Sequence, residues 1–212
     1  MAYPTISAPY GLLPVGLIGG RPYTGATRQM KIASNYGTAI GKGDLVKRVS
    51  DGTIERDAVT TAVATTGSMG VFMGCQYTDP NTSQLTFNNQ YPGSIVASDI
   101  KAFICDDPGV ILKVACCSSG ETIASVATTA LGNNIALINN TLETTNGISR
   151  VAADSTTEAV TSTLPFKVID IVEDTKTGSD AFVEILVIFN PPKDNGSNVL
   201  IGGHAYHNPV GI

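Results

Sequence analysis

Short runs of apolar and β-branched residues, separated by Gly, Pro, Asn and Asp, recur along most of the chain. This pattern is typical of β-strands joined by turns. The clearest example is residues 102–117, AFICDDPGVILKVACC, where two apolar runs flank Pro108 and Gly109. Pro followed by Gly fits the centre of a type II turn, and Asp106 and Asp107 can cap it by accepting local amide hydrogen bonds. We therefore predict a β-hairpin over residues 102–117.

Further strands are predicted on both sides of this hairpin. The Asp51-Gly52 pair between two alternating segments predicts a second hairpin over residues 45–56. Residues 165–172 and 181–189 predict an antiparallel pair, and the second is nearly apolar throughout, which indicates a central strand covered on both faces. Shorter strands are predicted at 31–33, 71–77, 84–87, 95–97 and 135–138, with a loop or a poor strand at 59–69 and a loop at 139–153. Ser119 could cap a short helix within 120–132, although the Thr content there opposes one.

The two ends of the chain depart from this pattern. Residues 1–30 contain four prolines and five glycines, which prevent a useful helix, yet they are too apolar for a disordered linker. Residues 191–212 begin with two prolines and are again Gly-rich. We therefore predict an all-β protein: an antiparallel β-barrel or sandwich core over 31–190, an extended N-terminal arm over 1–30, an extended C-terminal tail over 191–212, and at most one short helix.

Each end carries apolar side chains that could contact another subunit. The candidate interface residues are Tyr3, Tyr10, Leu12, Leu13, Leu17, Ile18 and Tyr23 in the arm, and Val199, Leu200, Ile201 and Tyr206 in the tail. The sequence leaves open whether the arm packs along its own domain or reaches a neighbouring subunit.

With 212 residues, the chain forms one domain with appendages or at most two small ones.

Charge narrows the range of partners. Its formal net charge is −5, and its 13 Lys and Arg residues are scattered, so we expect no nucleic-acid partner. The densest basic group, Lys42, Lys47 and Arg48, is interrupted by Asp44 and is interpreted as a solvated strand face. No signal peptide or membrane span is predicted, and Pro4, Pro9 and Pro14 break every candidate N-terminal helix.

The candidate chemistry is sparse. Cys75, Cys105, Cys116 and Cys117 show no Cys-x-x-Cys spacing, which favours reduced, buried thiols. The two histidines, His204 and His207, lie among Gly and Pro without an adjacent third ligand, so no metal site is predicted. Residues 16–21 lack the Lys-Ser/Thr ending of a phosphate loop. No His accompanies the Asp106–Asp107 pair, and we predict no cofactor and no enzyme activity.

Several stretches together resemble the head-decoration, or cement, proteins of tailed bacteriophages. They are residues 9–15, 40–46, 70–77, 106–108 and 164–168. The similarity spans most of residues 9–190, and its motifs are structural. The resemblance implies a β-rich fold, a homotrimer at local three-fold positions on the outside of a capsid, contact with the major capsid protein, and no cofactor. The tail after Asn190 is a departure, because shorter members lack it.

Three other functions remain open from the sequence. A tail-tube or connector protein would form rings in place of trimers. A carbohydrate-binding or adhesion module usually has exposed aromatic residues, whereas this chain has no Trp and seven Tyr. An enzyme is the least favoured, because both histidines lie in the terminal segment. The leading hypothesis is a structural virion protein on the capsid exterior.

Overall fold

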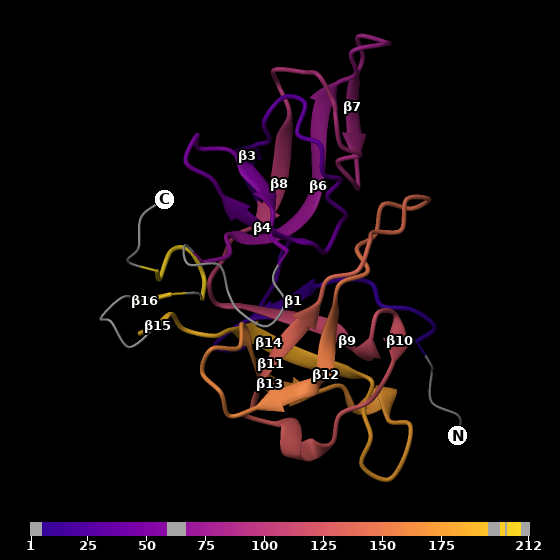
Figure 1. Ribbon diagram of the computed structural model, residues 1–212, viewed down its shortest axis with the longest axis vertical. Helices are drawn as coiled ribbons and strands as arrows, with labels where there is room; N and C mark the ends of the chain where they lie inside the picture. The colour runs from indigo at the N-terminus through magenta and orange to yellow at the C-terminus, as the bar shows by residue number, and fades with distance from the viewer. Residues whose placement is uncertain (1–5, 59–66, 195–199, 202, 209–212) are drawn as a thin grey trace.

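The computed structural model describes residues 6–58, 67–194, 200–201 and 203–208. Within these ranges the regular structure is β-strand, apart from two three-residue 3-10 helices, Thr128–Ala130 and Glu173–Thr175. The all-β prediction is confirmed. The strands form two barrels, stacked end to end along the long axis of the molecule (Figure 1).

The N-terminal barrel is built from five strands in the order β3-β8-β6-β4-β5. All neighbours in this order are antiparallel, and a parallel bridge between Ile32 and Ile54 joins the end of β3 to β5. A further strand, β7, pairs only with β6. The strands are β3 (Arg28–Lys31), β4 (Leu45–Arg48), β5 (Ile54–Arg56), β6 (Gly70–Thr78), β7 (Leu85–Asn88) and β8 (Lys101–Cys105).

The C-terminal barrel has the order β9-β14-β13-β11-β12. Its neighbours are antiparallel, and a parallel pairing of β12 with β9 closes it. Two short N-terminal strands, β1 and β2, extend the sheet from the edge of β9, and β10 also pairs with β9. The strands are β1 (Leu13–Leu17), β2 (Arg21–Pro22), β9 (Val110–Ser119), β10 (Thr122–Ile123), β11 (Asn134–Ile138), β12 (Ala152–Ala159), β13 (Phe166–Ile171) and β14 (Glu184–Phe189).

Each barrel encloses its own hydrophobic cluster. Phe72, Tyr91 and Ile104 lie in the cluster of the N-terminal barrel. Phe166 and Ile185 lie in that of the C-terminal barrel. The predicted β-rich range 31–190 therefore holds two cores, one for each barrel.

Several sequence predictions are confirmed. Residues 45–56 form the β4–β5 hairpin, in which Gly52 takes a positive φ of 83° and Asp51 Oδ1 accepts the Thr53 amide at 2.8 Å. β13 and β14 pair antiparallel, and β14 is central because β13 and β9 flank it. Strands also occur as predicted at residues 71–77, 84–87 and 135–138. In place of a helix, residues 120–132 hold β10 and a single 3-10 turn.

The predicted hairpin over residues 102–117 is wrong. β8 and β9 do not pair, because β3 and β6 occupy the two edges of β8, while β1, β12 and β14 occupy those of β9. The local turn is present, since Asp107 Oδ1 accepts the Gly109 amide at 2.8 Å. Residues 106–109 therefore connect the two barrels, where the sequence suggested a chain reversal within one sheet.

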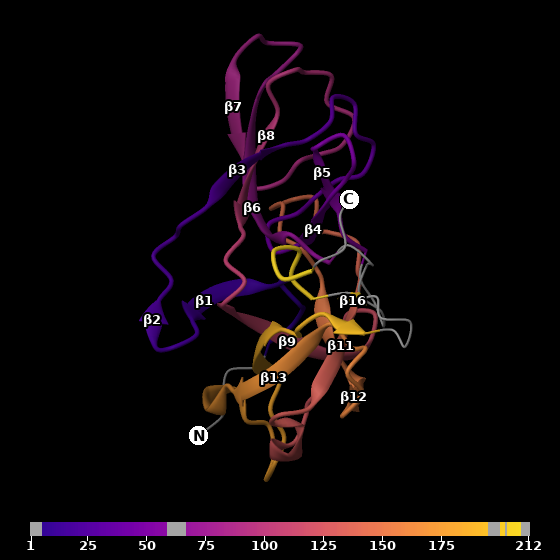
Figure 2. The same cartoon turned by 90° about the vertical axis from the view of Figure 1, so that its left-hand side faces the viewer.

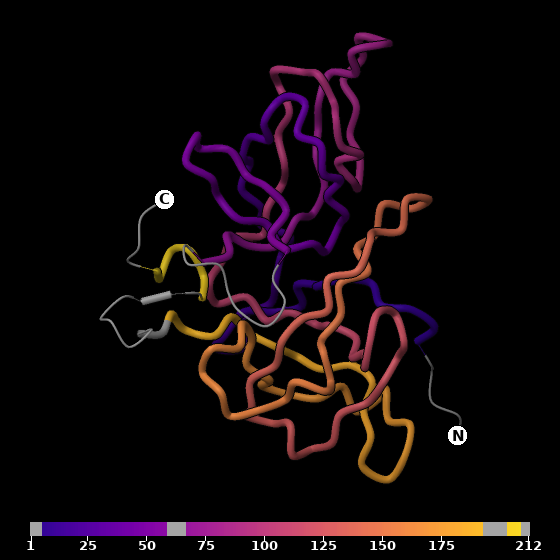
Figure 3. Tube along the Cα trace, viewed as in Figure 1, coloured from indigo at the N-terminus to yellow at the C-terminus, as the bar shows by residue number. Residues whose placement is uncertain are grey.

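Both predicted arms fold back along their own chain. β1 is part of the larger sheet, and the Leu12 and Gly11 amides donate to Gly43 O and Val151 O at 2.9 and 3.1 Å. In the tail, β15 (Lys193–Asp194) pairs with β16 (Leu200–Ile201), and Ser68 exchanges backbone hydrogen bonds with Gly203 and Ala205. Figure 3 shows the yellow tail beside the junction of the barrels. Backbone groups of both ends thus find partners within the monomer.

A buried ion pair ties the two barrels together. Asp44 is fully buried, and the basic residues on either side of it, Lys42, Lys47 and Arg48, are half-buried where a solvated strand face was predicted. Its carboxylate accepts hydrogen bonds from Arg56 Nε at 3.0 Å and from Ser149 Oγ at 2.6 Å. Arg56 also donates to Asn139 Oδ1 and Asn140 O, each at 2.8 Å. The 139–149 loop, which connects β11 to β12 in the C-terminal barrel, is therefore hydrogen-bonded to residues of the N-terminal barrel.

We expect Arg56→Ala to lower the free energy of unfolding by about 3 kcal/mol, because it leaves the buried Asp44 carboxylate without its charged partner. Urea unfolding followed by circular dichroism measures the change. Glu55→Ala on the same strand is the control, with an expected change below about 0.5 kcal/mol. Equal stability of the Arg56 and Glu55 variants would refute a structural role for the ion pair.

Candidate binding surface and barrel junction

The structure separates the predicted arm residues into buried and exposed positions. Tyr3 lies outside the described residues. Leu12 is 1% exposed in the core of the C-terminal barrel, so this residue is corrected from an interface contact to a core residue. Leu17 and Tyr23 are partly buried against the same core, whereas Leu13 and Ile18 are exposed. Only part of the predicted arm surface is therefore available to another protein.

Tyr10 anchors the start of the arm. Its hydroxyl donates a hydrogen bond to Glu184 Oε1, and its ring lies under Lys113 Nζ, 5.6 Å from the ring centroid. Lys113 Nζ is also 3.3 Å from Glu184 Oε1. Burial, followed by the bond to Glu184, raises the pKa of the Tyr10 hydroxyl far above its usual value. Tyr10 is thus committed to a contact within its own chain.

The predicted tail residues are also divided. Val199 lies outside the described residues, and Leu200 and Ile201 form the backbone of β16. Tyr206 is partly exposed, and its hydroxyl donates to Asp106 Oδ2, an oxygen that also lies 2.6 Å from Arg28 Nε. The tail therefore closes over the connection between the barrels.

Exposed apolar side chains gather on one side of the N-terminal barrel and on β1. Phe87 is 66% exposed, and Phe87, Phe103 and Met73 line one hollow of about 390 Å³. Met73 also lines a smaller hollow of about 190 Å³ with Leu13. We call the exposed Leu13, Leu85 and Phe87, together with the half-buried Met73 and Phe103, the apolar band. Figure 2 shows β1 and β7, which carry its two ends, on the same side of the molecule.

The apolar band was only partly predictable. Leu13 was among the predicted interface residues, but Met73, Leu85, Phe87 and Phe103 were not. Leu85 and Phe87 alternate with Thr86 and Asn88, which predicts a strand but not the face that is covered. Because β7 pairs only with β6 and lies outside the barrel, its apolar side chains face solvent. Exposed apolar side chains grouped beside half-buried ones in this way make a candidate protein-binding site.

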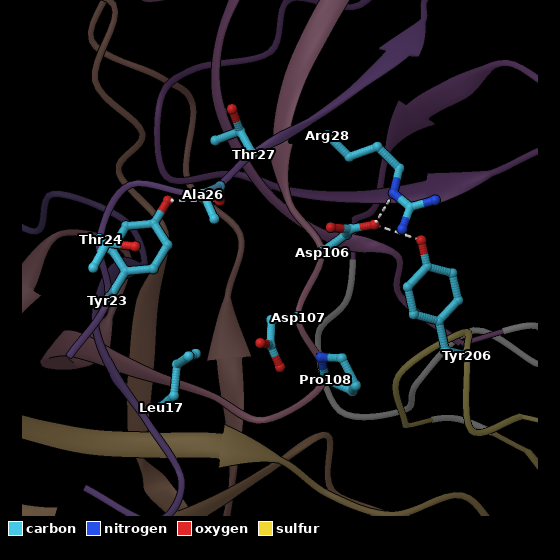
Figure 4. Close-up of a pocket in the computed structure, with 10 residues that line it drawn as sticks. All are labelled: Leu17, Tyr23, Thr24, Ala26, Thr27, Arg28, Asp106, Asp107, Pro108 and Tyr206. Atoms are coloured by element: carbon cyan, nitrogen blue, oxygen red, sulfur yellow. Dashed lines mark hydrogen bonds and ion pairs between the residues drawn. The ribbon is translucent and has the colours of Figure 1, made fainter. Parts of the chain in front are cut away.

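A groove of about 500 Å³ lies at the barrel junction (Figure 4). Tyr23 and Leu17 line one side of it, and Asp107 and Pro108 lie across from them. Its charged groups are largely satisfied, because Arg28 pairs with Asp106 and Asp107 caps its own turn. The groove therefore joins the barrels and offers few free polar groups for a ligand.

His204 is the most perturbed basic group in the described structure. It is 1% exposed and packs against the rings of Phe189 and Tyr206, each with a centroid separation of 5.1 Å. Its Nδ1 accepts the Tyr206 amide at 3.2 Å. Burial, together with His207, lowers the pKa of His204 to about 4, although Asp106 and Asp107 oppose the shift. His204 is therefore a neutral packing residue of the junction.

We expect the free energy of unfolding to fall as the pH drops from about 6.5 to 4, because the unfolded chain takes up a proton that buried His204 refuses. The full loss from this group is about 3 kcal/mol. Urea unfolding between pH 4 and 7 measures it, and His204→Phe should flatten this part of the profile. His207→Asn should keep most of the slope, because burial lowers the pKa of His204 more than His207 does. An identical pH slope for wild type and His204→Phe would contradict the assignment.

The four thiols are free and buried, as predicted. Burial raises the pKa of all four, to about 12 for Cys75 and about 11 for Cys117. A nucleophilic cysteine needs the opposite shift. These thiols therefore act as small apolar core residues.

The described residues offer neither a metal site nor a membrane-spanning helix. Among them, no group of three or more His, Cys, Asp or Glu side chains is arranged to hold a metal ion. No helix of the described chain is long and apolar enough to cross a membrane.

Comparison of the chain with protein-family models, curated proteins and solved structures gives no match in any of the three. Leu13, Leu85 and Phe87 are the exposed members of the apolar band and its candidate contacts with a partner.

Proposed function

We propose that the chain is a structural virion protein that decorates and stabilises the outside of a tailed-phage capsid as a homotrimer bridging major capsid protein subunits. The apolar band is the observation that carries this proposal. The two joined barrels form one body, and the apolar band gives one side of that body a surface that can bind another protein. The sequence resemblance to head-decoration proteins and the acidic net charge of −5, which suits a surface away from packaged DNA, add to it.

The folded-back ends change how the proposal is tested. Deleting the N-terminal arm would remove β1 and Leu12, and with them part of the C-terminal barrel and its core. Loss of capsid binding after such a deletion would report unfolding as readily as a lost contact. Point substitutions at the exposed end of the band avoid this problem.

We expect Phe87→Glu to weaken binding to undecorated capsids by about tenfold or more, because burying a Phe side chain contributes about 1.5–3 kcal/mol and a buried unpaired charge opposes binding. Co-sedimentation of the purified protein with capsids measures occupancy. Val160→Glu is the matched control, because Val160 is an exposed apolar residue of the C-terminal barrel, 87% exposed, outside the band. Undiminished occupancy for Phe87→Glu would remove the band from the mechanism.

We expect the protein bound to capsids to be trimeric. Native mass spectrometry of protein released from particles under mild conditions measures the number of copies. Three copies support capsid decoration at three-fold positions, and six-membered rings would favour the alternative of a tail-tube or connector protein.

A further inference from the structure

The two barrels share more than their strand order. β6 has a bulge at Met73 in its pairing with β8, and β13 has one at Ile169 in its pairing with β14. When these bulges are aligned, Ile104 of β8 corresponds to Val187 of β14. Their partners across the next pairing, Arg28 of β3 and Leu112 of β9, then correspond as well.

Two other contacts give the same correspondence independently. Counting the same number of residues onward from Arg28 and from Leu112 makes Ile32 correspond to Cys116. These two residues make the parallel contacts of the barrels, Ile32 with Ile54 and Cys116 with Ala153. The Ile32 amide donates to Ile100 O at 3.3 Å, and the Cys116 amide donates to Val183 O at 2.8 Å. The chain is therefore an internal duplication of one five-stranded barrel, with the register of its strands preserved.

The duplication shows that one strand edge is paired in the C-terminal barrel, whereas the corresponding edge of the N-terminal barrel is unpaired. Because the Cys116 amide points toward β14, the backbone groups of Ile111 and Lys113 point to the opposite edge of β9. There they pair with β1, Ile111 with Gly16 and Lys113 with Leu13. The corresponding residues of β3 are Thr27 and Gln29.

In the N-terminal barrel no described strand pairs with this edge. Thr27 and Gln29 are exposed, and β3 has β8 as its ladder partner, with the outer contact beginning only at Ile32. An unpaired strand edge presents N–H and C=O groups that can accept another strand. The β1–β9 pairing shows that the same type of edge accepts one in this chain.

The charges beside the open edge indicate what it would accept. Lys31 lies directly opposite Lys101 across the β3–β8 pair, and like charges at such positions repel. No described carboxylate makes an ion pair with either lysine. Asp99 lies near Lys101 and offsets part of its charge while accepting a hydrogen bond from Thr78 Oγ1 at 2.6 Å, but it makes no ion pair with either lysine. A carboxylate from outside the chain would neutralise this pair.

We infer that the outer edge of β3 binds an extended, acidic segment of a partner protein, which adds as an antiparallel strand at Thr27 and Gln29 in the way that β1 adds to β9. β1 itself is already used by β9. Among the other short strands that pair along one edge only, β2, β7 and β10 carry no carboxylate, and in β15 Asp194 follows Lys193 directly. A second copy of the chain therefore fits this edge less well than an acidic partner. The inference does not depend on the proposed function.

The test uses a fluorescein-labelled peptide of residues 10–18 carrying Gly11→Glu, the position that would face Lys31 in the β1 register. We expect fluorescence anisotropy to show binding to the full-length protein. Gln29→Pro should weaken binding by about tenfold or more, because it removes an outward N–H without touching the β8 pairing. Gln29→Ala keeps the N–H and should bind as wild type. Circular dichroism spectra and melting temperatures establish that both variants are folded.

Several outcomes would overturn the inference. Absence of peptide binding, or equal binding by wild type and Gln29→Pro, would exclude strand addition at this edge. Equal binding of the unmodified, neutral peptide, or no loss with Lys31→Glu, would exclude the acidic partner. Concentration-dependent dimers that Gln29→Pro abolishes would make a second copy the occupant. Tighter binding of the acidic peptide, lost in both Gln29→Pro and Lys31→Glu, supports the inference.

Discussion

Both barrels depend on one parallel contact between their first and third strands. Ile32 and Ile54 make it in the N-terminal barrel, and β9 and β12 make it in the C-terminal barrel. All other neighbouring strands in each order pair antiparallel. The parallel contact joins the two end strands of the order and so closes the open sheet into a barrel around a hydrophobic cluster. Its position also decides which edges stay open. β9 has ten residues and pairs with β1 and β12 in succession, whereas the four-residue β3 leaves its outer edge unpaired.

The contacts between the barrels set how the molecule presents its surfaces. The Asp44–Arg56 pair joins them by its hydrogen bonds to the 139–149 loop. Tyr206 of the tail is hydrogen-bonded to Asp106 in the segment that connects the barrels. With the two bodies joined in several places, the apolar band on β6, β7 and β8 is continued by Leu13 of β1. A partner can therefore contact residues of both barrels at once, which is the property expected of a protein that reinforces a shell.

The sequence predicts individual strands well and their assembly poorly. Alternation and the Asp51-Gly52 turn are local signals, so the β4–β5 hairpin was correctly predicted. The Asp-Pro-Gly turn before β9 is equally clear, but a turn does not specify whether its flanking strands pair. Whether they pair depends on which other strands occupy their edges. The edges of β9 are taken by β1 and β14, two strands that lie far from the turn in the sequence. The duplication was also missed, because corresponding positions such as Arg28 and Leu112 differ in chemistry while their backbone pairing is the same.

The apparent arms illustrate a second limit. Pro and Gly correctly indicate that residues 1–30 form no helix, yet Leu12 enters the core and β1 joins the sheet. Apolar composition alone cannot distinguish a segment that covers its own domain from one that reaches a neighbour. Exposure in the folded chain makes that distinction, and it shifts the candidate interface from the arm toward β6, β7 and β8.

A density map of the intact particle tests the central claim most directly. The account predicts the chain on the outer surface at local three-fold positions, with Phe87, Met73 and Leu13 against the capsid shell. A map in which these side chains face solvent, or in which the chain is absent from the capsid exterior, would contradict it.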